Sequence, residues 1–334
     1  GLVASGKPII NMGIGSPDLQ PPTKVLKAIQ GSLNDISAHK YQSYQGLPEL
    51  RNAISEFYKN KFSVDSNPEN EVLPLIPNPG YPTYTSVTKL VGAQPLFYNL
   101  SDATNWQPNF DELEALDLSE VKIMWVNYPH MPTGTNATLQ TFEKLVAFGK
   151  KHNILIINDN PYSFILNDNP ISILQVEGVK DIALEVNSLS KTFNMAGWRV
   201  GMLLGNATYI NEVLKVKSNM DSGMFYGIQK GAIEALHLSD SWFLEQNKIY
   251  EERRNLIWKL ADKLNATYNK NSTGLFVWAK ISEGKKSEEV TDSVLYDKDI
   301  FITPGTIFGS QGEGYIRFSL CVTSEIIKEA ISRF

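Results

Sequence analysis

The sequence predicts an α/β fold in which a mostly parallel β-sheet has helices packed on both faces, followed by a smaller α+β domain. Three apolar, strand-like runs support the sheet: 121–127 (VKIMWVN), 154–159 (ILIIND) and 182–188 (IALEVNS). Near-continuous apolar runs of this length are typical of parallel strands that helices cover on both faces. Between the first two runs, Thr138 is a suitable N-cap for an amphipathic helix whose buried face is predicted to hold Leu139, Phe142, Leu145, Val146 and Gly149.

The second domain is predicted from a change of pattern near residue 236. Residues 237–264 place aromatic and aliphatic side chains at helical spacing over a long stretch. Short strand-like runs follow at 274–281 and 314–320, with a helical pattern at the C-terminus. We therefore expect a small C-terminal domain over 236–334.

Composition narrows the classes of function. The 334 residues carry 31 basic and 36 acidic side chains, a net charge of −5, which gives no electrostatic reason to expect nucleic acid as a partner. The single cysteine excludes an internal disulfide, and the four histidines are not at metal-ligand spacing. No apolar run approaches the roughly 18 residues that span a bilayer, and the first residues do not resemble a signal peptide. These features predict a cytoplasmic protein that acts on small molecules, with no metal and no membrane contact.

The predicted strands end in polar residues. Asn127, Asp159 and Ser188 are the last residues of the three runs. Ligands of open α/β sheets bind beyond the carboxyl ends of the strands, so we expect the functional site at this edge.

Lys191 lies just after the third strand, in the densest cluster of the chain, SLSKTFNMAGWRVG (188–201). Burying an unpaired ammonium group is costly, whereas a neutral lysine is a nucleophile that forms Schiff bases with carbonyl compounds. Arg199 adds a planar fork suited to phosphate. Without further observations, a surface loop with an incidental lysine explains this string equally well.

Two further strings lie at strand ends. Asp159 is followed by Tyr162 in NDNPYSF, where a carboxylate could hold a proton on a heteroaromatic nitrogen and a phenol could donate to an oxyanion. An Asx turn before Pro161 with a packing tyrosine is the structural alternative. The string NYPHMPTG (127–134) closes the first strand and could be a simple turn.

Taken together, these motifs resemble the class I/II aminotransferases, the pyridoxal-phosphate enzymes of fold type I. The motif S-x-S-K, followed eight residues later by the arginine of GWRVG, is highly specific, and the resemblance covers nearly the whole chain in order. It implies a three-layer α/β/α large domain with a mostly parallel seven-stranded sheet, a small α+β domain and a homodimer with shared active sites. The other domain bounds, a large domain over 39–235 and an N-terminal segment over 1–38 that belongs to the small domain, rest on this family resemblance. The branch it resembles includes LL-diaminopimelate, alanine and aspartate aminotransferases.

The resemblance also implies roles for single residues around the cofactor, pyridoxal 5′-phosphate. Lys191 would form the Schiff base and shuttle the substrate proton, Asp159 would pair with the protonated pyridine nitrogen, and Tyr162 would bond the phenolic oxygen. The remaining cofactor residues would be the phosphate ligands Ser188, Ser190 and Arg199, Asn127 beside the ring, Tyr81 stacked on the ring, and Tyr41, which reaches the phosphate of the neighbouring subunit.

The substrate would be held by its α-carboxylate. Arg317, in YIRFSL, matches the arginine that grips this group bidentately, a geometry for which arginine is preferred over lysine. Gly15, in MGIGSPD, would bring a backbone group to the same carboxylate. From the residues alone, Arg317 could equally be a surface side chain of a strand.

The sequence departs from the family pattern at two places. Met131 replaces an asparagine that bonds the cofactor's phenolic oxygen, so we expect a modest effect on the pKa of the Schiff base, with Tyr162 acting alone or His130 compensating. Between Leu75 and Ile76 the family has about two dozen further residues: a glycine-containing turn, the helix whose N-terminus holds the phosphate, and a strand. We expect that segment to be missing from this sequence.

The predicted reaction is transfer of an amino group from an L-amino acid to a 2-oxo acid by a ping-pong mechanism. The same Lys191, Asp159 and Arg317 would also serve a C–S β-lyase or a decarboxylase. A non-enzymatic module, such as the aminotransferase-like half of a transcription regulator, is disfavoured because the sequence keeps Lys191 and shows no helix-turn-helix extension.

Overall fold

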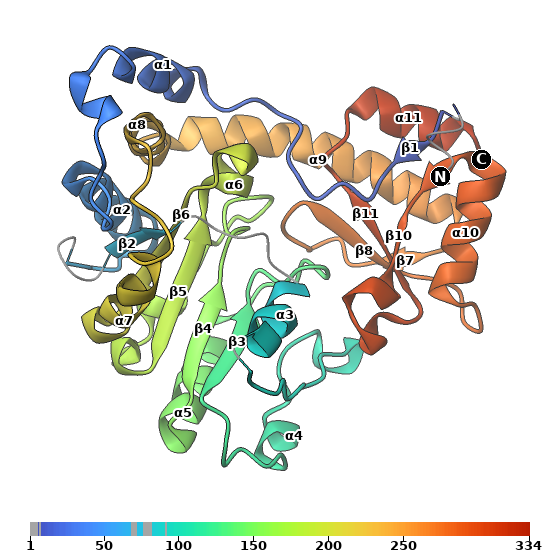
Figure 1. Cartoon of the computed structure of the whole chain (residues 1–334). Helices are drawn as coiled ribbons and strands as arrows, with labels where there is room; N and C mark the ends of the chain where they lie inside the picture. Colours follow the sequence, from blue (N-terminus) through green and yellow to red (C-terminus); the bar gives the residue numbers. More distant parts are fainter. Residues whose placement is uncertain (1–5, 7, 68–71, 76–81, 91) are drawn as a thin grey trace.

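A five-stranded β-sheet forms the centre of the larger part of the molecule in the computed structural model, which describes residues 6, 8–67, 72–75, 82–90 and 92–334 (Figure 1). The strands lie in the order β2 (Val72–Leu75), β6 (Gly201–Gly205), β5 (Ala183–Ser188), β4 (Leu155–Asp159) and β3 (Ile123–Asn127). β3, β4 and β5 are the three strands predicted from the apolar runs. They pair in parallel, so their carboxyl ends meet at one edge.

The sheet differs from the expected one in two respects. The described residues contribute five strands rather than seven, and only two of the four pairings are parallel, because β6 runs antiparallel to both β5 and β2. The chain between β5 and β6 contains only short helical turns, so β6 turns back beside β5 instead of crossing over. The sequence also lacks, between Leu75 and Ile76, the segment in which the resemblance places a further strand.

Helices cover both faces of the sheet and form a three-layer arrangement. One face packs against α2 (Pro48–Phe62), α5 (Leu139–His152) and α8 (Tyr226–Leu236), which share the first hydrophobic core with side chains of β3 to β6. The opposite face packs against α7 (Ala207–Lys217), and Tyr84 of α3 (Pro82–Leu90) stacks there on Trp125 of β3. The larger part also contains α1 (Thr23–Ser32), α4 (Phe110–Glu114) and α6 (Leu189–Thr192).

Helix α5 shows how local sequence sets these elements. Its N-cap is Thr138, whose hydroxyl accepts a hydrogen bond from the backbone N–H of Thr141 at 3.1 Å, as the sequence predicted. The predicted face is buried except for Leu139, the first residue of the helix, which is 44% exposed. Gly149 is required by a close approach: a Cβ there would lie 2.7 Å from the carbonyl oxygen of Ile154.

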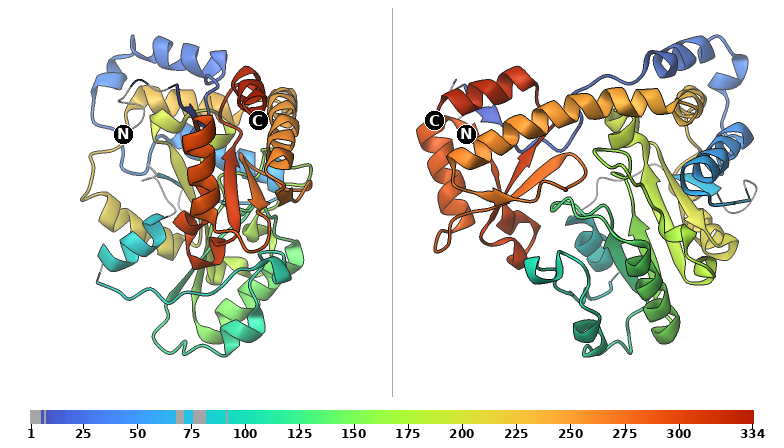
Figure 2. Two further views of the ribbon diagram at one scale, coloured as in Figure 1. Left: turned by 90° about the vertical axis from the view of Figure 1, so that its right-hand side faces the viewer. Right: turned by 180° about the vertical axis from the view of Figure 1, so that it is seen from behind.

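The smaller part is built on a second, antiparallel sheet (Figure 2). Its strands lie in the order β10 (Thr303–Pro304), β11 (Tyr315–Ser319), β8 (Phe276–Lys280) and β7 (Thr267–Tyr268). One face of this sheet packs in the second hydrophobic core with α9 (Asp240–Lys263), α10 (Ser287–Lys298) and α11 (Ser324–Ser332). The N-terminal β1 (Ile10–Asn11) pairs in parallel with β9 (Ile300–Phe301), so the start of the described chain lies against this part.

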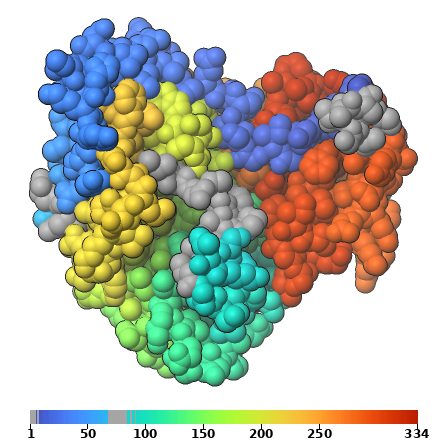
Figure 3. All heavy atoms as spheres, in the orientation of Figure 1, coloured from blue at the N-terminus to red at the C-terminus, as the bar shows by residue number. Residues whose placement is uncertain are grey.

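Two segments connect the parts. The long helix α9, predicted from its aromatic and aliphatic spacing, contributes Phe243 to the first core and Ile257 to the second (Figure 1). The segment between β1 and α1 crosses the surface from the smaller part to the larger one (Figure 3). The predicted domain boundary between residues 235 and 236 falls at the end of α8, and the division into domains stays a prediction. Within the described ranges, no helix is both long enough and apolar enough to cross a membrane.

Candidate active site

The three polar strand ends come together as predicted. Asn127 and Asp159 are paired in the register of β3 and β4, and the Asn127 side-chain amide donates to the Asp159 backbone carbonyl at 2.7 Å. Asp159 pairs with Val186, two residues before Ser188, so side-chain alternation places Asp159 and Ser188 on the same face of the sheet. This edge of the sheet is therefore the centre of the candidate site.

Lys191 lies in α6, directly after β5. The N-cap of this short helix is Ser188, whose hydroxyl accepts from the backbone N–H of Ser190 at 3.1 Å. Burial lowers the pKa of the Lys191 amine, and the positive charges of Arg199 and Arg317 act in the same direction while Asp159 opposes them. A larger fraction of the amine is therefore neutral and nucleophilic at a given pH. The amine donates a hydrogen bond to the backbone carbonyl of Gly15.

Asp159 has a strongly perturbed carboxyl group. Burial raises its pKa to about 6, and the negative charge of Glu185 adds to this effect, whereas Tyr84 and Lys191 lower the pKa. The Tyr84 hydroxyl donates to the Asp159 carboxylate at 2.5 Å, and its ring stacks on Trp125 with 4.9 Å between centroids.

Tyr84 is a site residue that the sequence prediction missed. The prediction chose Tyr81 of the same string, and Tyr81 lies outside the described residues. The signal that could have found Tyr84 is its place in the same string, three residues after Tyr81.

The predicted phosphate ligands lie beside Lys191. The Ser190 hydroxyl oxygen is buried and has no hydrogen-bond partner among the described residues. The Ser188 hydroxyl donates to the backbone carbonyl of Val200 at 3.3 Å, and the Arg199 guanidinium donates to that of Ala196 at 2.8 Å. Ser190 is therefore the hydroxyl most ready to bind a ligand oxygen.

Arg317 projects from β11 and is 5% exposed. Its guanidinium lies over the rings of Phe276 and Phe308, with its central carbon 4.0 Å and 4.7 Å from their centroids. One terminal nitrogen donates to the backbone carbonyl of Gly13 at 3.1 Å, and the other lies 3.4 Å from the Met131 sulfur. Arg317 is therefore not a surface side chain, which was the alternative left open by the sequence. A buried arginine between apolar rings is suited to a carboxylate ligand.

The N-terminal segment contacts two of the cationic side chains of the site, Lys191 and Arg317. Besides Gly13 on Arg317 and Gly15 on Lys191, Asp18 forms a bidentate ion pair with the buried Arg253 of α9, at 2.7 Å and 2.9 Å. The sequence reasoning did not find the Asp18–Arg253 pair, because its members are separated by most of the chain.

The loop after β3 supports the site from the side. Met131, at the position where the family has asparagine, donates its backbone N–H to the Asn127 side-chain oxygen at 2.9 Å. Tyr162 is buried beside Phe276, with 6.1 Å between ring centroids. Burial lowers the pKa of His130 to about 4, and its ring nitrogen Nδ1 lies 2.8 Å from the Thr133 hydroxyl. The imidazole is therefore neutral near neutral pH, and its compensation for Met131 stays a prediction.

Two other features lie away from the centre. Tyr41 is 90% exposed, between the short helix η2 (Ile36–His39) and α2, and does not reach the site of its own chain.

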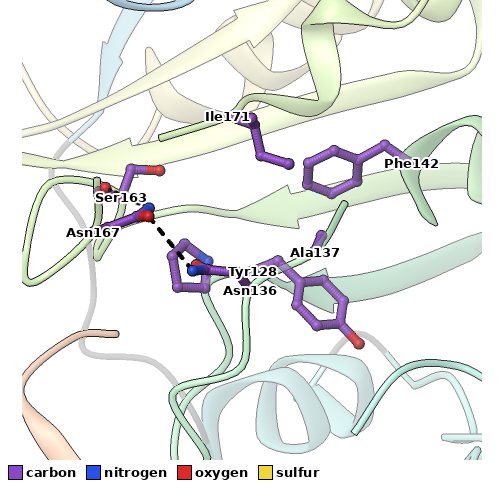
Figure 4. A pocket seen from close by; sticks show the side chains of 8 residues that line it. Tyr128, Asn136, Ala137, Phe142, Ser163, Asn167 and Ile171 are labelled. Carbon is purple, nitrogen blue, oxygen red and sulfur yellow. Dashed lines mark hydrogen bonds between the residues drawn. The ribbon is translucent and has the colours of Figure 1, made fainter. Parts of the chain in front are cut away.

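A small pocket lies behind the 128–137 loop, where the Asn136 amide donates to the Asn167 side chain at 3.4 Å (Figure 4). Its lining contains none of Lys191, Asp159 and Arg317, so it is not the substrate site.

Comparisons of the sequence and of the structure with known proteins agree on the family of this chain. The sequence model of the family described as aminotransferase class I and II matches residues 7–75 and 74–334. LL-diaminopimelate aminotransferases from Dehalococcoides mccartyi and Maridesulfovibrio salexigens are each 37% identical over 99% of this chain and over 91% and 92% of their own. The solved structure of apo-BacF from Bacillus subtilis has a TM-score of 0.93 and 33% identity, and the match covers 99% of this chain and 91% of that one.

The comparisons also bear on the junction at Leu75. The alignment with the Dehalococcoides mccartyi protein spans 354 positions, and 354 − 334 leaves at least 20 positions without a residue of this chain. The two matched stretches of the family model meet at residues 74–75, where a segment was predicted to be missing. The family-model match is therefore split at the predicted junction, and the alignment with this relative contains positions for which the present sequence has no residue.

Proposed function

Because the chain belongs to the class I and II aminotransferases, we propose that it transfers an amino group from an L-amino acid to a 2-oxo acid with pyridoxal 5′-phosphate bound at Lys191. One observation carries this proposal: a lysine of lowered pKa, an aspartate of raised pKa and a buried arginine converge at one sheet edge. A structural role alone does not explain a buried arginine and two partly buried charged groups that have two glycine carbonyls and a tyrosine among their partners.

The chemistry of the side chains fits the cofactor. The Lys191 amine suits an aldehyde, the Asp159 carboxylate suits a protonated ring nitrogen, and the buried Ser190 hydroxyl without a partner suits a phosphate oxygen. When bound, pyridoxal phosphate supplies an electron sink for the pair of electrons left at the substrate Cα. The part of the site expected to hold the cofactor phosphate is less complete than the part expected to hold the ring. The helix that would hold the phosphate is expected in the segment that the sequence lacks after Leu75.

The residues of the chain would divide the work as follows. Lys191 would hold the cofactor through its amine and would accept the proton from the substrate Cα, a task for which its lowered pKa is suited. Asp159 keeps a proton on the ring nitrogen, and Tyr84 keeps Asp159 ionised. Tyr162 and Asn127 would line the ring, and Ser188, Ser190 and Arg199 would hold the phosphate.

Arg317 would hold the α-carboxylate of the substrate. Its two terminal nitrogens now face the Gly13 carbonyl and the Met131 sulfur, which are neutral and weaker acceptors than a carboxylate. A substrate carboxylate would therefore replace them, and Gly15, next in the same segment, would contribute a backbone group. We propose a diaminopimelate-type amino donor, because the similar curated proteins carry that name.

We also propose a homodimer with shared sites. Large apolar side chains are exposed on two neighbouring segments: Ile36 is 75%, Tyr41 90% and Met220 79% exposed. These segments, residues 35–41 and 220–226, contact each other, since the Tyr226 hydroxyl donates to the Asp35 carboxylate at 3.0 Å. An apolar surface of this kind is typical of an interface, and it would place Tyr41 against the partner's phosphate. Light scattering should report twice the chain mass, and Met220→Glu should shift the protein towards the monomer.

The cytoplasmic location stays a prediction.

The experiment is a single-turnover assay with the purified chain and added pyridoxal phosphate. We expect the cofactor absorbance to change to the amine form with diaminopimelate or another L-amino acid, with release of the matching 2-oxo acid. Lys191→Ala should abolish the change, and Lys285→Ala, on an exposed loop, is the matched control. Release of carbon dioxide would instead show a decarboxylase. Release of ammonia together with a 2-oxo acid, without conversion of the cofactor to its amine form, would show a β-lyase.

A further inference from the structure

The face of the sheet behind the candidate site contains a buried carboxylate. Glu185 lies in the middle of β5, is 0% exposed and is surrounded by the first hydrophobic core. It pairs with Asn158 of β4, and alternation places both on the face opposite Asp159. An unpaired charge at such a position would be strongly destabilising, so its partners decide what the residue does.

Glu185 accepts five hydrogen bonds. The donors are the Tyr58 hydroxyl at 2.9 Å, the side-chain amides of Asn158 and Asn160 at 3.0 Å and 3.2 Å, the Ser172 hydroxyl at 2.9 Å and the Ile173 backbone N–H at 3.1 Å. We call Glu185 and the five residues that donate to it the Glu185 cluster. Burial raises the pKa of Glu185, but a carboxylate surrounded by five donors has the geometry of the ionised form.

The Glu185 cluster ties together the ends of the three parallel strands. Asn158 and Asn160 flank Asp159 in sequence, so Glu185 holds the β4 end on both sides of the catalytic aspartate. The Asn158 side-chain oxygen also accepts from the Tyr128 backbone N–H at 3.1 Å, next to Asn127 at the end of β3.

A second branch reaches the end of β5. The Tyr58 hydroxyl accepts from the Asn187 amide at 3.1 Å, and the Asn187 side-chain oxygen accepts from the backbone N–H of Ser188 at 2.7 Å. The network therefore joins the residues beside Asn127, Asp159 and Ser188, although Glu185 and Asn158 lie on the opposite face of the sheet from the Asp159 and Ser188 side chains.

We propose that Glu185 is a positioning residue of the active site, which sets the relative positions of Asn127, Asp159 and Ser188 from behind the sheet. The role in catalysis rests on the proposed function, whereas the positioning itself does not. Side chains that hold reacting groups need their own supporting contacts, because small displacements of the reacting groups cost much of the rate.

The test compares Glu185→Gln with Ser172→Ala in the cofactor-free chain. Whichever way the glutamine amide turns, its NH₂ faces the NH₂ group of Asn158 or Asn160, so the variant disturbs at least one side of Asp159. Ser172→Ala removes one donor to the same carboxylate but has no bond to a strand end.

Hydrogen exchange of the backbone amides of Tyr128, Asn160 and Ser188 is the first readout. We expect exchange about tenfold faster or more at these amides in Glu185→Gln, the size expected for losing a charged acceptor, and no change there in Ser172→Ala. Unchanged exchange at all three amides in Glu185→Gln, or equal changes in the two variants, would overturn the proposal. If Glu185→Gln does not fold, Tyr58→Phe, which cuts only the β5 branch, should speed exchange at Ser188 alone, and unchanged exchange there overturns it.

The second readout is the affinity for pyridoxal phosphate, measured by quenching of tryptophan fluorescence. Glu185→Gln should bind the cofactor about tenfold more weakly, and Ser172→Ala should bind it like the wild type. Wild-type affinity in a variant whose strand ends exchange faster would refute the link to the site. A wild type that binds no cofactor would instead refute the proposed function, while the exchange result still decides on the positioning.

Discussion

Replacing Asp159 by asparagine should make the cofactor-free protein more stable and should do so in a pH-dependent way. Burial raises the pKa of this carboxyl from its ordinary 3.8 to about 6. Between these values the native state binds more protons than the unfolded state, so the stability contributed by Asp159 is complete below pH 3.8 and is lost as the pH rises to 6. At 1.36 kcal/mol per pKa unit, the full loss is about 3 kcal/mol.

Asparagine has nearly the same shape and still accepts from Tyr84, but it carries no charge. The gain in the free energy of unfolding from Asp159→Asn should therefore be about 2 kcal/mol larger at pH 7 than at pH 4.5, by the linkage of proton binding to folding. Urea unfolding followed by circular dichroism at both pH values measures this difference, since other titrating groups cancel between the two proteins. The exposed Asp292→Asn is the matched control.

A gain that is the same at pH 4.5 and pH 7, or a wild type that is the more stable protein at pH 7, would refute the reasoning. Added pyridoxal phosphate provides a further check. It should stabilise the wild type more than Asp159→Asn, because a ligand stabilises the native state in proportion to its affinity and the variant lacks the partner of the ring nitrogen.

Three other substitutions test other contacts of the site. Tyr84→Phe removes a hydrogen bond to a charged group, worth about 1.5–3 kcal/mol, so the pKa of Asp159 should rise by about one to two units and the acidic limb of the kcat/KM profile should move up with it. Arg317→Lys should lower kcat/KM by about 10- to 100-fold, because one of two bonds to the substrate carboxylate is lost; an unchanged value would remove Arg317 from the site. Asp18→Asn should lower the free energy of unfolding by about 2 kcal/mol, since it leaves the buried Arg253 without its charged partner, whereas Glu212→Gln, in an exposed pair, should change it by less than about 0.5 kcal/mol.

Much of the fold could be predicted from local patterns. Apolar runs and helical spacing identified β3, β4, β5, α5 and α9, because the residues that form these elements also form their cores. The polar residues at the strand ends followed from the same runs, since a parallel arrangement brings Asn127, Asp159 and Ser188 to one edge. Arg317 and Lys191 were found through their motifs, and the structure places both near the N-terminal segment.

The residues that the sequence did not reveal act through distant contacts. In the sequence, Glu185 is a single polar residue within a strand predicted to be buried. Its proposed positioning role depends on hydrogen bonds from Tyr58 of α2 and from the two asparagines that flank Asp159. Asp18 and Arg253 become an ion pair only when the N-terminal segment crosses to α9. The strand number could not be predicted from the printed sequence alone, because the expected sheet was that of longer relatives.

Burial acts in opposite directions on the two central groups of the site. It lowers the pKa of Lys191, which favours the neutral amine that the proposed reaction needs, and it raises the pKa of Asp159, which disfavours the carboxylate that the reaction needs. A drier site would therefore improve the lysine and impair the aspartate. The Tyr84 hydroxyl acts on Asp159 without hydrating Lys191, because it donates directly to the carboxylate from α3. This selective contact favours the ionised form of Asp159 without disfavouring the neutral form of Lys191, so we expect Tyr84 to contribute to the proposed chemistry beside the residues that the motif identifies.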